Sequence, residues 1–215
     1  MKKPIISLVI PCYNEAENLE RLVTRCEEVF EEIGIEVILV DNGSIDSTPE
    51  IMPSLVVGSQ VCRSTRIEVN QGYGYGILSG LKICQGDFLG WTHADLQTDP
   101  ADVLAALKII LSNEGKGYFI KGERHNRPLI DAVFAWGMAL FEFLVLGVKM
   151  WDINAQPNIF PRSFFESWDK TPHDFSLDLF AYTSAVKRGI EIKRIPVYFP
   201  ARKAGIGSND TLKKK

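Results

Sequence analysis

One stretch decides the fold of this chain: residues 86–100, which read Gly86-Asp87-Phe88-Leu89-Gly90-Trp91-Thr92-His93-Ala94-Asp95-Leu96-Gln97-Thr98-Asp99-Pro100. The apolar run predicts a short buried strand, and Pro100 predicts the first turn of a helix. If the chain stays extended after the strand, His93, Asp95 and Gln97 lie on one face. Their imidazole, carboxylate and amide groups suit Mg²⁺ or Mn²⁺, and the imidazole favours Mn²⁺. The alternative is a plain helix N-terminus with acidic residues near its positive end.

The overall composition is that of a folded globular protein. A chain of 215 residues is long enough for one well-packed domain. The net charge of −3 provides no basic surface for nucleic acid. The four cysteines have no paired spacing, which indicates reduced thiols and a cytoplasmic protein. The N-terminus leads directly into a strand-like run, so we expect no signal peptide.

Strand and helix patterns alternate through the first half of the chain. Buried strands are expected at residues 5–11, 36–40 and 67–69, in the apolar run between Gly86-Asp87 and His93, and at 117–121. Helical periodicity is expected at residues 19–33, from Asp46 or Ser47 toward Met52, up to Cys84, and at 101–111. Short links between these elements imply right-handed parallel crossovers. The fold class is therefore α/β, with a mostly parallel sheet flanked by helices.

The second half of the chain changes character. Residues 129–151 are very apolar but are interrupted by Asp131 and Glu142, which leaves too short a run for a membrane span of about 20 residues. A buried helix and a helix lying on a bilayer surface both fit this segment. Residues 152–162 read as irregular, and 178–188 as helical. Residues 191–199 read as a last strand, which Pro196 places at a sheet edge.

Polar side chains follow four of the predicted strands. In an open α/β sheet, ligands bind beyond the carboxyl ends of the strands. Any one of these clusters fits ordinary turn chemistry, but four together indicate a ligand site. They are Tyr13-Asn14-Glu15, Asp41-Asn42-Gly43-Ser44, Asn70-Gln71-Gly72 and His93-Ala94-Asp95-Leu96-Gln97.

The sequence argues against a dinucleotide site. The glycines at 72, 74 and 76 have the wrong spacing for the dinucleotide fingerprint. The first strand-to-helix turn contains no glycine and has Glu15 where a pyrophosphate would bind. We expect these glycines to let the backbone pass close to another segment.

These motifs resemble the family 2 glycosyltransferases, and among them the polyprenyl-phosphate sugar transferases of the dolichol-phosphate mannose synthase type. The resemblance extends over nearly the whole chain. It rests on residues 7–19 (SLVIPCYNEAENL), 40–48 (VDNGSIDST), 70–72 (NQG), 86–87 (GD) and 93–97 (HADLQ), and on weaker similarities at 122–124 (GER), 152–158 (DINAQPN) and 202–208 (RKAGIGS). It implies a single nucleotide-diphospho-sugar transferase domain, with a nucleotide-sugar half at about 1–122 and an acceptor half at about 123–215.

The resemblance also implies roles for individual residues. The donor nucleotide sugar would be held by Pro11, Tyr13, Asn14, Glu15, Asp41, Asn42, Asn70, Gly72, Ala94, Arg124 and Arg202. Asp95 and Gln97, with His93, would hold the metal ion on the donor diphosphate. His93 stands where the family has an aspartate, and Asn158 where it has an arginine.

The expected reaction is an inverting, metal-dependent transfer of the sugar at its anomeric carbon. A lipid-phosphate acceptor is already anionic and needs no base, whereas a hydroxyl acceptor needs one, for which Asp152 is the first candidate and Asp178 the second. Three outcomes therefore stay open: transfer to a polyprenyl phosphate, transfer to a glycan hydroxyl, and a nucleotide-sugar-binding module without catalysis. We expect any contact with the membrane to be peripheral and at its cytoplasmic face.

Overall fold

The computed structural model describes residues 3–112, 117–125, 147 and 150–198. Arg202 and most of the apolar segment 129–151 lie outside the described residues, so the predictions made for them stay predictions. No helix within the described residues is long and apolar enough to cross a membrane.

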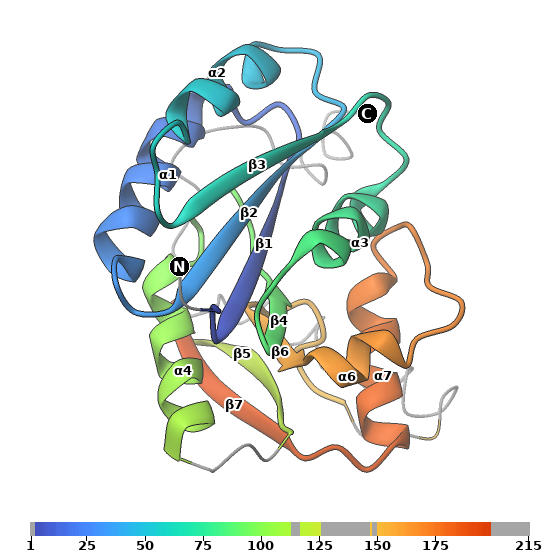
Figure 1. Cartoon of the computed structure of the whole chain (residues 1–215). Coiled ribbons are helices and arrows are strands. Elements are labelled where there is room, and N and C mark those ends of the chain that lie inside the picture. Colours follow the sequence, from blue (N-terminus) through green and yellow to red (C-terminus); the bar gives the residue numbers. More distant parts are fainter. Residues whose placement is uncertain (1–2, 113–116, 126–146, 148–149, 199–215) are drawn as a thin grey trace.

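A seven-stranded sheet forms the centre of the molecule (Figure 1), in the order β3-β2-β1-β4-β6-β5-β7. Its strands are β1 (Ile6–Cys12), β2 (Ile35–Asn42), β3 (Cys62–Ile67), β4 (Phe88–Trp91), β5 (Phe119–His125), β6 (Asn158–Pro161) and β7 (Ile192–Tyr198). The first four strands pair in parallel, as do β5 and β7, whereas β6 is antiparallel to both of its neighbours. This confirms the expected α/β class with a mostly parallel sheet.

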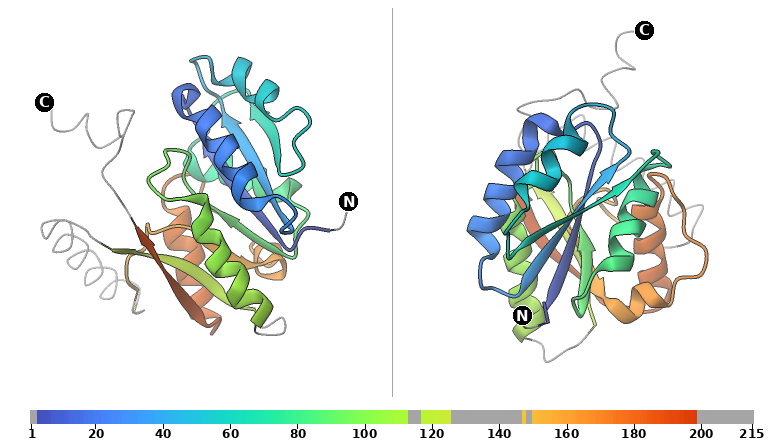
Figure 2. Two further views of the ribbon diagram at one scale, coloured as in Figure 1. Left: turned by 90° about the vertical axis from the view of Figure 1, so that its left-hand side faces the viewer. Right: turned by 45° about the horizontal axis from the view of Figure 1, so that its top comes forward.

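Helices cover both faces of the sheet (Figure 2). On one face lie α1 (Ala16–Phe30), α2 (Thr48–Leu55) and α4 (Val103–Ser112), the last preceded by a 3-10 turn, η1 (Pro100–Asp102). On the other lie α3 (Tyr73–Ile83), α6 (Arg162–Glu166) and α7 (Leu177–Lys187). Alternate residues of β1 supply the two cores, because successive side chains of a strand point to opposite faces: Leu8 and Ile10 pack in the first core, and Val9 in the second.

Some expected elements are placed differently in the structure. The third strand is β3 (Cys62–Ile67) rather than residues 67–69, and Val69 is 70% exposed. This edge strand reads Cys-Arg-Ser-Thr-Arg-Ile, so it contains no apolar run that would reveal it. Residues 152–162 are not wholly irregular, since β6 (Asn158–Pro161) inserts between β4 and β5. The first helix ends at Phe30, before Glu32 and Gly34, which both have positive φ.

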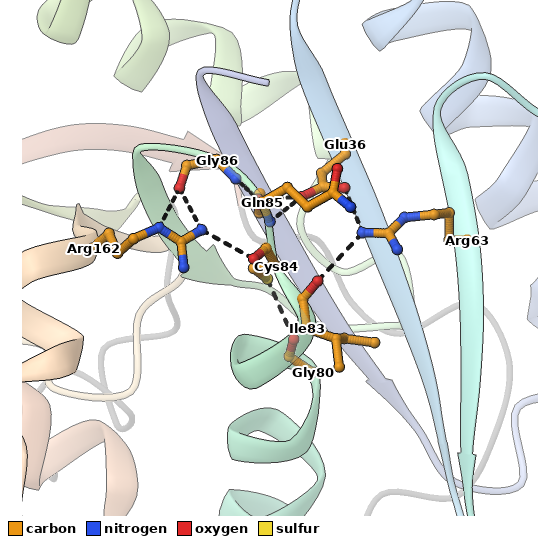
Figure 3. A network of polar contacts seen from close by, with 9 residues as sticks. Glu36, Arg63, Gly80, Ile83, Cys84, Gln85, Gly86 and Arg162 are labelled. Atoms are coloured by element: carbon orange, nitrogen blue, oxygen red, sulfur yellow. Dashed lines mark hydrogen bonds and ion pairs between the residues drawn. The ribbon is translucent and has the colours of Figure 1, made fainter. Parts of the chain in front are cut away.

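A polar network fixes the start of β4 (Figure 3). The Gln85 amide donates to Glu36 Oε1 at 2.6 Å, and the Gly86 amide donates to Ser7 Oγ at 2.7 Å. On the other side, the Arg162 guanidinium donates to the carbonyl of Gly86 at 2.8 and 2.6 Å and to that of Cys84 at 3.0 Å. Ser7 and Glu36 lie near the beginnings of β1 and β2, so this network is at the amino edge of the sheet, opposite the polar loops.

Candidate functional site

The loops after β1 and β2 are bound to each other at the carboxyl edge of the sheet. The Asn14 amide donates to Ser44 Oγ at 3.0 Å, and the Ile45 amide donates to Asn14 Oδ1 at 2.9 Å. The Glu15 amide donates to Thr48 Oγ1 at 3.0 Å. Asn14, which was predicted to contact the donor, therefore also holds the two loops together.

Buried acceptor atoms lie at the end of β2. Asp41 is 2% exposed, and its Oδ1 accepts the Ser44 amide at 2.9 Å. Asp41 Oδ2 is buried without a hydrogen-bond partner among the described residues, and Arg66 Nε is 3.6 Å away. Asn42 donates to the carbonyl of Gly72 at 3.1 Å, while its own Oδ1 is also buried and unsatisfied by any described residue. A ligand with N–H or O–H groups would satisfy both atoms.

Three predicted donor contacts lie on and after β1. Pro11 is half-buried in the strand and is paired in register with Val40 of β2. Tyr13 is 45% exposed, so its ring is accessible for stacking on a base. Glu15 Oε2 accepts a hydrogen bond from Asn18 Nδ2 at 2.7 Å within the first turn of α1.

The loop after β4 is turned rather than extended. The strand ends at Trp91, Asp95 Oδ1 accepts the Gln97 amide at 3.1 Å, and Leu96 has a φ of 56°. The chain does not stay extended after the strand, so the condition for His93, Asp95 and Gln97 to alternate on one face is not met. All three are half-buried in one short turn, and Ala94 is buried between them in the sequence.

Contacts on both sides hold this loop. Thr92 Oγ1 and Thr98 Oγ1 are 3.1 Å apart and share a hydrogen bond across its base. Asp99 accepts the Ala101 amide at the start of η1 and two hydrogen bonds from Arg25 of α1, at 3.0 and 2.9 Å. Within the described part of the chain, no cluster of three or more His, Cys, Asp or Glu side chains could hold a metal ion.

Arg124 and Asp152 form one buried pair. Asp152 accepts hydrogen bonds from the Arg124 backbone amide at 2.9 Å, from Nε at 2.9 Å and from Nη2 at 2.5 Å. The exposed fractions of the two side chains are 16% for Arg124 and 3% for Asp152. The sequence predicted separate roles for the two residues, whereas in the structure Asp152 holds Arg124 through three hydrogen bonds.

Positive φ angles recur in these loops. Four described non-glycine residues have positive φ, and three of them, Asn14, Leu96 and Asp152, lie in the loops described above. Such conformations cost free energy and are concentrated at functional sites. Their placement independently marks this edge of the sheet.

Glycines bring a second segment against the start of α3. A Cβ on Gly72 would lie 2.4 Å from the His173 carbonyl oxygen, and one on Gly74 would lie 2.8 Å from the carbonyl oxygens of Pro172 and Asp174. The Tyr75 amide donates to the His173 carbonyl at 2.9 Å. The predicted close approach at these glycines is therefore confirmed. Asn70, whose Oδ1 accepts the Gly72 amide at 2.8 Å, orders the turn that leads into the helix.

Behind the site lies a buried polar cluster that the sequence did not reveal. Asp178, the second candidate base at the start of a predicted helix, is 4% exposed. Its Oδ1 accepts from Asn158 Nδ2 at 2.7 Å and from Trp91 Nε1 at 3.2 Å. Asn158 Oδ1 in turn accepts from Lys121 Nζ at 2.7 Å. The one available signal was a lysine that directly follows the apolar run Tyr118-Phe119-Ile120 in a predicted buried strand.

Burial changes the acid–base properties of this cluster. It lowers the pKa of Lys121 to about 7, although Asp178 acts in the opposite direction. It also raises the pKa of Tyr73, and the nearby Asp178 adds to this effect. The Tyr73 hydroxyl accepts a hydrogen bond from Gln156 Nε2 at 2.5 Å. The cluster thus joins α3, β4, β5, β6 and α7 beneath the site.

Comparisons with known proteins agree with this architecture. The family model described as Glycosyl transferase family 2 matches residues 7–176. The undecaprenyl-phosphate 4-deoxy-4-formamido-L-arabinose transferase of Pseudomonas paraeruginosa is 28% identical over 170 residues, which cover 76% of this chain and 49% of that protein. The transferase of the same name from Salmonella paratyphi B is 38% identical over 136 residues, which cover 60% of this chain and 39% of that protein. The chain thus spans half the length or less of these curated relatives.

Solved structures show the same fold. Glucosyl-3-phosphoglycerate synthase from Mycobacterium tuberculosis, crystallised with Mn²⁺, uridine diphosphate and glucosyl-3-phosphoglycerate, superposes with a TM-score of 0.71 at 18% identity, covering 99% of this chain and 75% of that one. The family match over most of the chain, the sheet order and the polar loops at the carboxyl edge lead to one conclusion. The chain belongs to the glycosyl transferase family 2.

Proposed function

We propose that this chain transfers a sugar from a nucleoside-diphosphate sugar to a polyprenyl phosphate. The observation that carries the proposal is the convergence at one sheet edge of the unsatisfied acceptors of Asp41 and Asn42, the Asp95 loop, and Arg124. The acceptor atoms of Asp41 and Asn42 suit the N–H and O–H groups of a nucleoside. The Asp95 loop, with a metal ion, and Arg124 suit a diphosphate. The curated relatives, named as undecaprenyl-phosphate sugar transferases, support the choice of acceptor.

Asp95, Gln97 and His93 are the residues that would hold a divalent ion. Their oxygen-rich set fits Mg²⁺ or Mn²⁺, and the solved relative contains Mn²⁺ with uridine diphosphate. When bound, the ion would neutralise charge on the donor diphosphate. Either a uridine or a guanosine nucleotide would be compatible with the acceptor atoms of Asp41 and Asn42.

In the transfer step, an anionic oxygen of the acceptor phosphate forms a bond to the anomeric carbon of the sugar. The bond from that carbon to the donor diphosphate breaks, its electron pair stays on the diphosphate oxygen, and the configuration inverts. Arg124 stabilises the leaving charge, held in place by the three hydrogen bonds that it donates to Asp152. No proton has to be removed from the acceptor.

The Asp152 contacts favour this acceptor over a glycan hydroxyl. Both oxygens of Asp152 already accept hydrogen bonds from Arg124, so a role as base toward a hydroxyl would compete with holding that guanidinium. A lipid phosphate needs no base, so Asp152 can keep its hydrogen bonds to Arg124 during the transfer. We place the reaction at the cytoplasmic face of a membrane, because a polyprenyl phosphate is anchored in one.

The test is a thermal-shift panel followed by transfer assays. We expect UDP or GDP to stabilise the protein with Mn²⁺ and not with chelator, and the matching nucleotide sugar to label undecaprenyl phosphate in detergent or vesicles. Asp95→Asn should abolish both effects, whereas Asp87→Asn, at the opposite edge of the sheet beside Lys3, serves as the matched control. Transfer to a glycan hydroxyl and not to the lipid phosphate would overturn the acceptor assignment. Nucleotide binding without any transfer would indicate a binding module.

A further inference from the structure

Lys121 is an unusual residue in the interior of this domain. It lies in β5 and is completely buried. Its Nζ donates to the carbonyl of Ala155 and to Asn158 Oδ1, each at 2.7 Å, and lies 5.6 Å from the centre of the Tyr182 ring. Both hydrogen-bond acceptors belong to the segment that runs from Asp152 into β6.

This segment connects the buried lysine to the proposed phosphate-binding arginine. The Ala155 amide donates to the Asp152 carbonyl at 3.1 Å, closing a turn whose first residue, Asp152, has a φ of 48°. The side chain of Asp152 then holds the Arg124 guanidinium. Lys121 and Arg124 lie on the same strand, three residues apart. Lys121 holds the end of the turn at Ala155, and Asp152, at the beginning of the turn, holds Arg124.

The backbone of β5 closes against the same segment. The Gly122 amide donates to the Pro157 carbonyl at 2.9 Å, and a Cβ on Gly122 would lie 2.2 Å from the Gln156 carbonyl oxygen. The turn therefore has little room to shift unless the contacts of Lys121 are lost. Arg194 of β7 supports it from the outside, by donating to the carbonyls of Trp151 and Gly122.

Stability does not explain a lysine at this position. Removing an ammonium from water is costly, and an apolar side chain of similar volume is often neutral or stabilising in its place. The Tyr182 ring lies beside the ammonium and stacks on Phe119, and the polar neighbours Asn158 and Asp178 already hydrogen-bond to each other. What the lysine supplies, and an apolar residue would not, is a pair of directed hydrogen bonds to the 152–158 segment.

We propose that Lys121 is the positioning residue for Arg124, acting through the turn at Asp152 and Ala155. The inference rests on the proposed function, because the role of Arg124 toward the donor diphosphate comes from it. Lys121 does not touch the substrate. Through the turn, it fixes the position of the Arg124 guanidinium.

The test compares Lys121→Met, Lys121→Gln and a control, Val29→Ala, on the intact chain. Met keeps the stem and loses the donors, whereas Gln keeps a donor on a shorter side chain. Val29 lies on α1 in the core on the opposite face and provides a stability-matched loss unrelated to the site. Melting temperature, kcat, affinities for UMP and UDP (or the guanosine pair), and hydrogen exchange of residues 150–158 are measured for each.

We expect Lys121→Met to remain folded, to exchange faster across residues 150–158, and to lose kcat by about 10- to 100-fold, as a displaced charged group would cause. Affinity for the monophosphate should stay within about twofold, because the nucleoside site is on β1 and β2, whereas affinity for the diphosphate falls. Lys121→Gln should recover part of the loss, and Val29→Ala should keep its kcat despite its lower melting temperature.

The two proposals fail differently. If Lys121→Met keeps wild-type kcat, diphosphate affinity and exchange, the positioning role is overturned and the proposed function stands. If its kcat falls only in proportion to melting temperature, as for Val29→Ala, the role is general stability and the inference is also overturned. If the wild type binds no nucleotide and transfers no sugar, the proposed function fails, while exchange across residues 150–158 still reports whether Lys121 holds the turn.

Discussion

Replacing Asp152 by asparagine tests the geometry of the site most directly. The change preserves the shape of the side chain but removes its charge and places an amide where a carboxylate oxygen meets the Arg124 guanidinium. Three hydrogen bonds, at 2.9, 2.9 and 2.5 Å, are weakened or lost. The guanidinium is left in a site where its side chain is only 16% exposed.

The size of the effect follows from burial. Removing one partner of a buried ion pair typically costs about 3–5 kcal/mol, whereas an exposed pair contributes about 0.2–1 kcal/mol. Because Arg124 retains some contact with solvent, we expect a loss near the lower end, about 3 kcal/mol. In a domain of this size each kcal/mol lowers the melting temperature by about 2–4 °C, so a fall of about 6–12 °C should follow.

The assay is urea unfolding of a double-mutant cycle with Arg124→Met. We expect the two single variants to be coupled by about 1.5–3 kcal/mol, since the second change removes the charge that the first left unpaired. Both single variants should also lose transfer activity. A loss below about 1 kcal/mol without coupling would refute the reasoning, because the pair would then behave like a surface ion pair.

Three further predictions concern other parts of the molecule. Burial lowers the pKa of Lys121 to about 7, below its unfolded value of about 10.4, so the unfolded state binds the extra proton between these values. The stability of the wild type relative to Lys121→Met, measured by urea unfolding, should therefore rise between about pH 7 and 10.4, by up to about 1.4 kcal/mol per pH unit. It should be flat below this window, and a flat difference throughout would contradict the prediction. Gly74→Ala should cost about 1–3 kcal/mol and increase hydrogen exchange at 172–175, because its Cβ meets backbone atoms at 2.8 Å; an unchanged melting temperature would rule out that contact. Asp95→Ala should abolish the Mn²⁺-dependent part of the nucleotide-induced shift, which for the wild type at 100 times the dissociation constant is about 5–10 °C, and a retained shift would remove Asp95 from the metal site.

The parallel half of the fold could be predicted because its signals are local. Apolar runs, short links and polar residues after each strand are visible without any knowledge of distant contacts, and they placed β1, β2, β4 and the helices between them. The strand β6 has only four residues, ends on a proline and pairs antiparallel with segments far away in sequence, so no local pattern marks it.

The positions of the candidate site residues after the strands could be predicted from the sequence, but their geometry could not. Asp41, Asn42 and the loop at 93–97 were identified from their positions after strands, yet the turn at Leu96 depends on one backbone angle that residue types do not determine. The buried cluster of Lys121 and Asp178 was not predicted, because nothing in either residue considered alone indicates that it is buried with a polar partner. Only the spatial neighbours of a charged side chain decide whether it can be buried.

The four cysteines provide an internal way to follow opening of the protein. All four are buried and free of disulfides. Cys12, Cys26 and Cys62 lie in the core beneath α1, whereas Cys84 lies in the core beneath α3. A thiol reagent reaches each one only when its own layer opens, so labelling resolved by peptide would report separately on the two sides of the sheet. Because Cys84 is also next to the network that starts β4, its labelling rate would report opening at the amino edge of the sheet. The labelling rate of Cys12, the last residue of β1, would report opening at the carboxyl edge, where the candidate site lies.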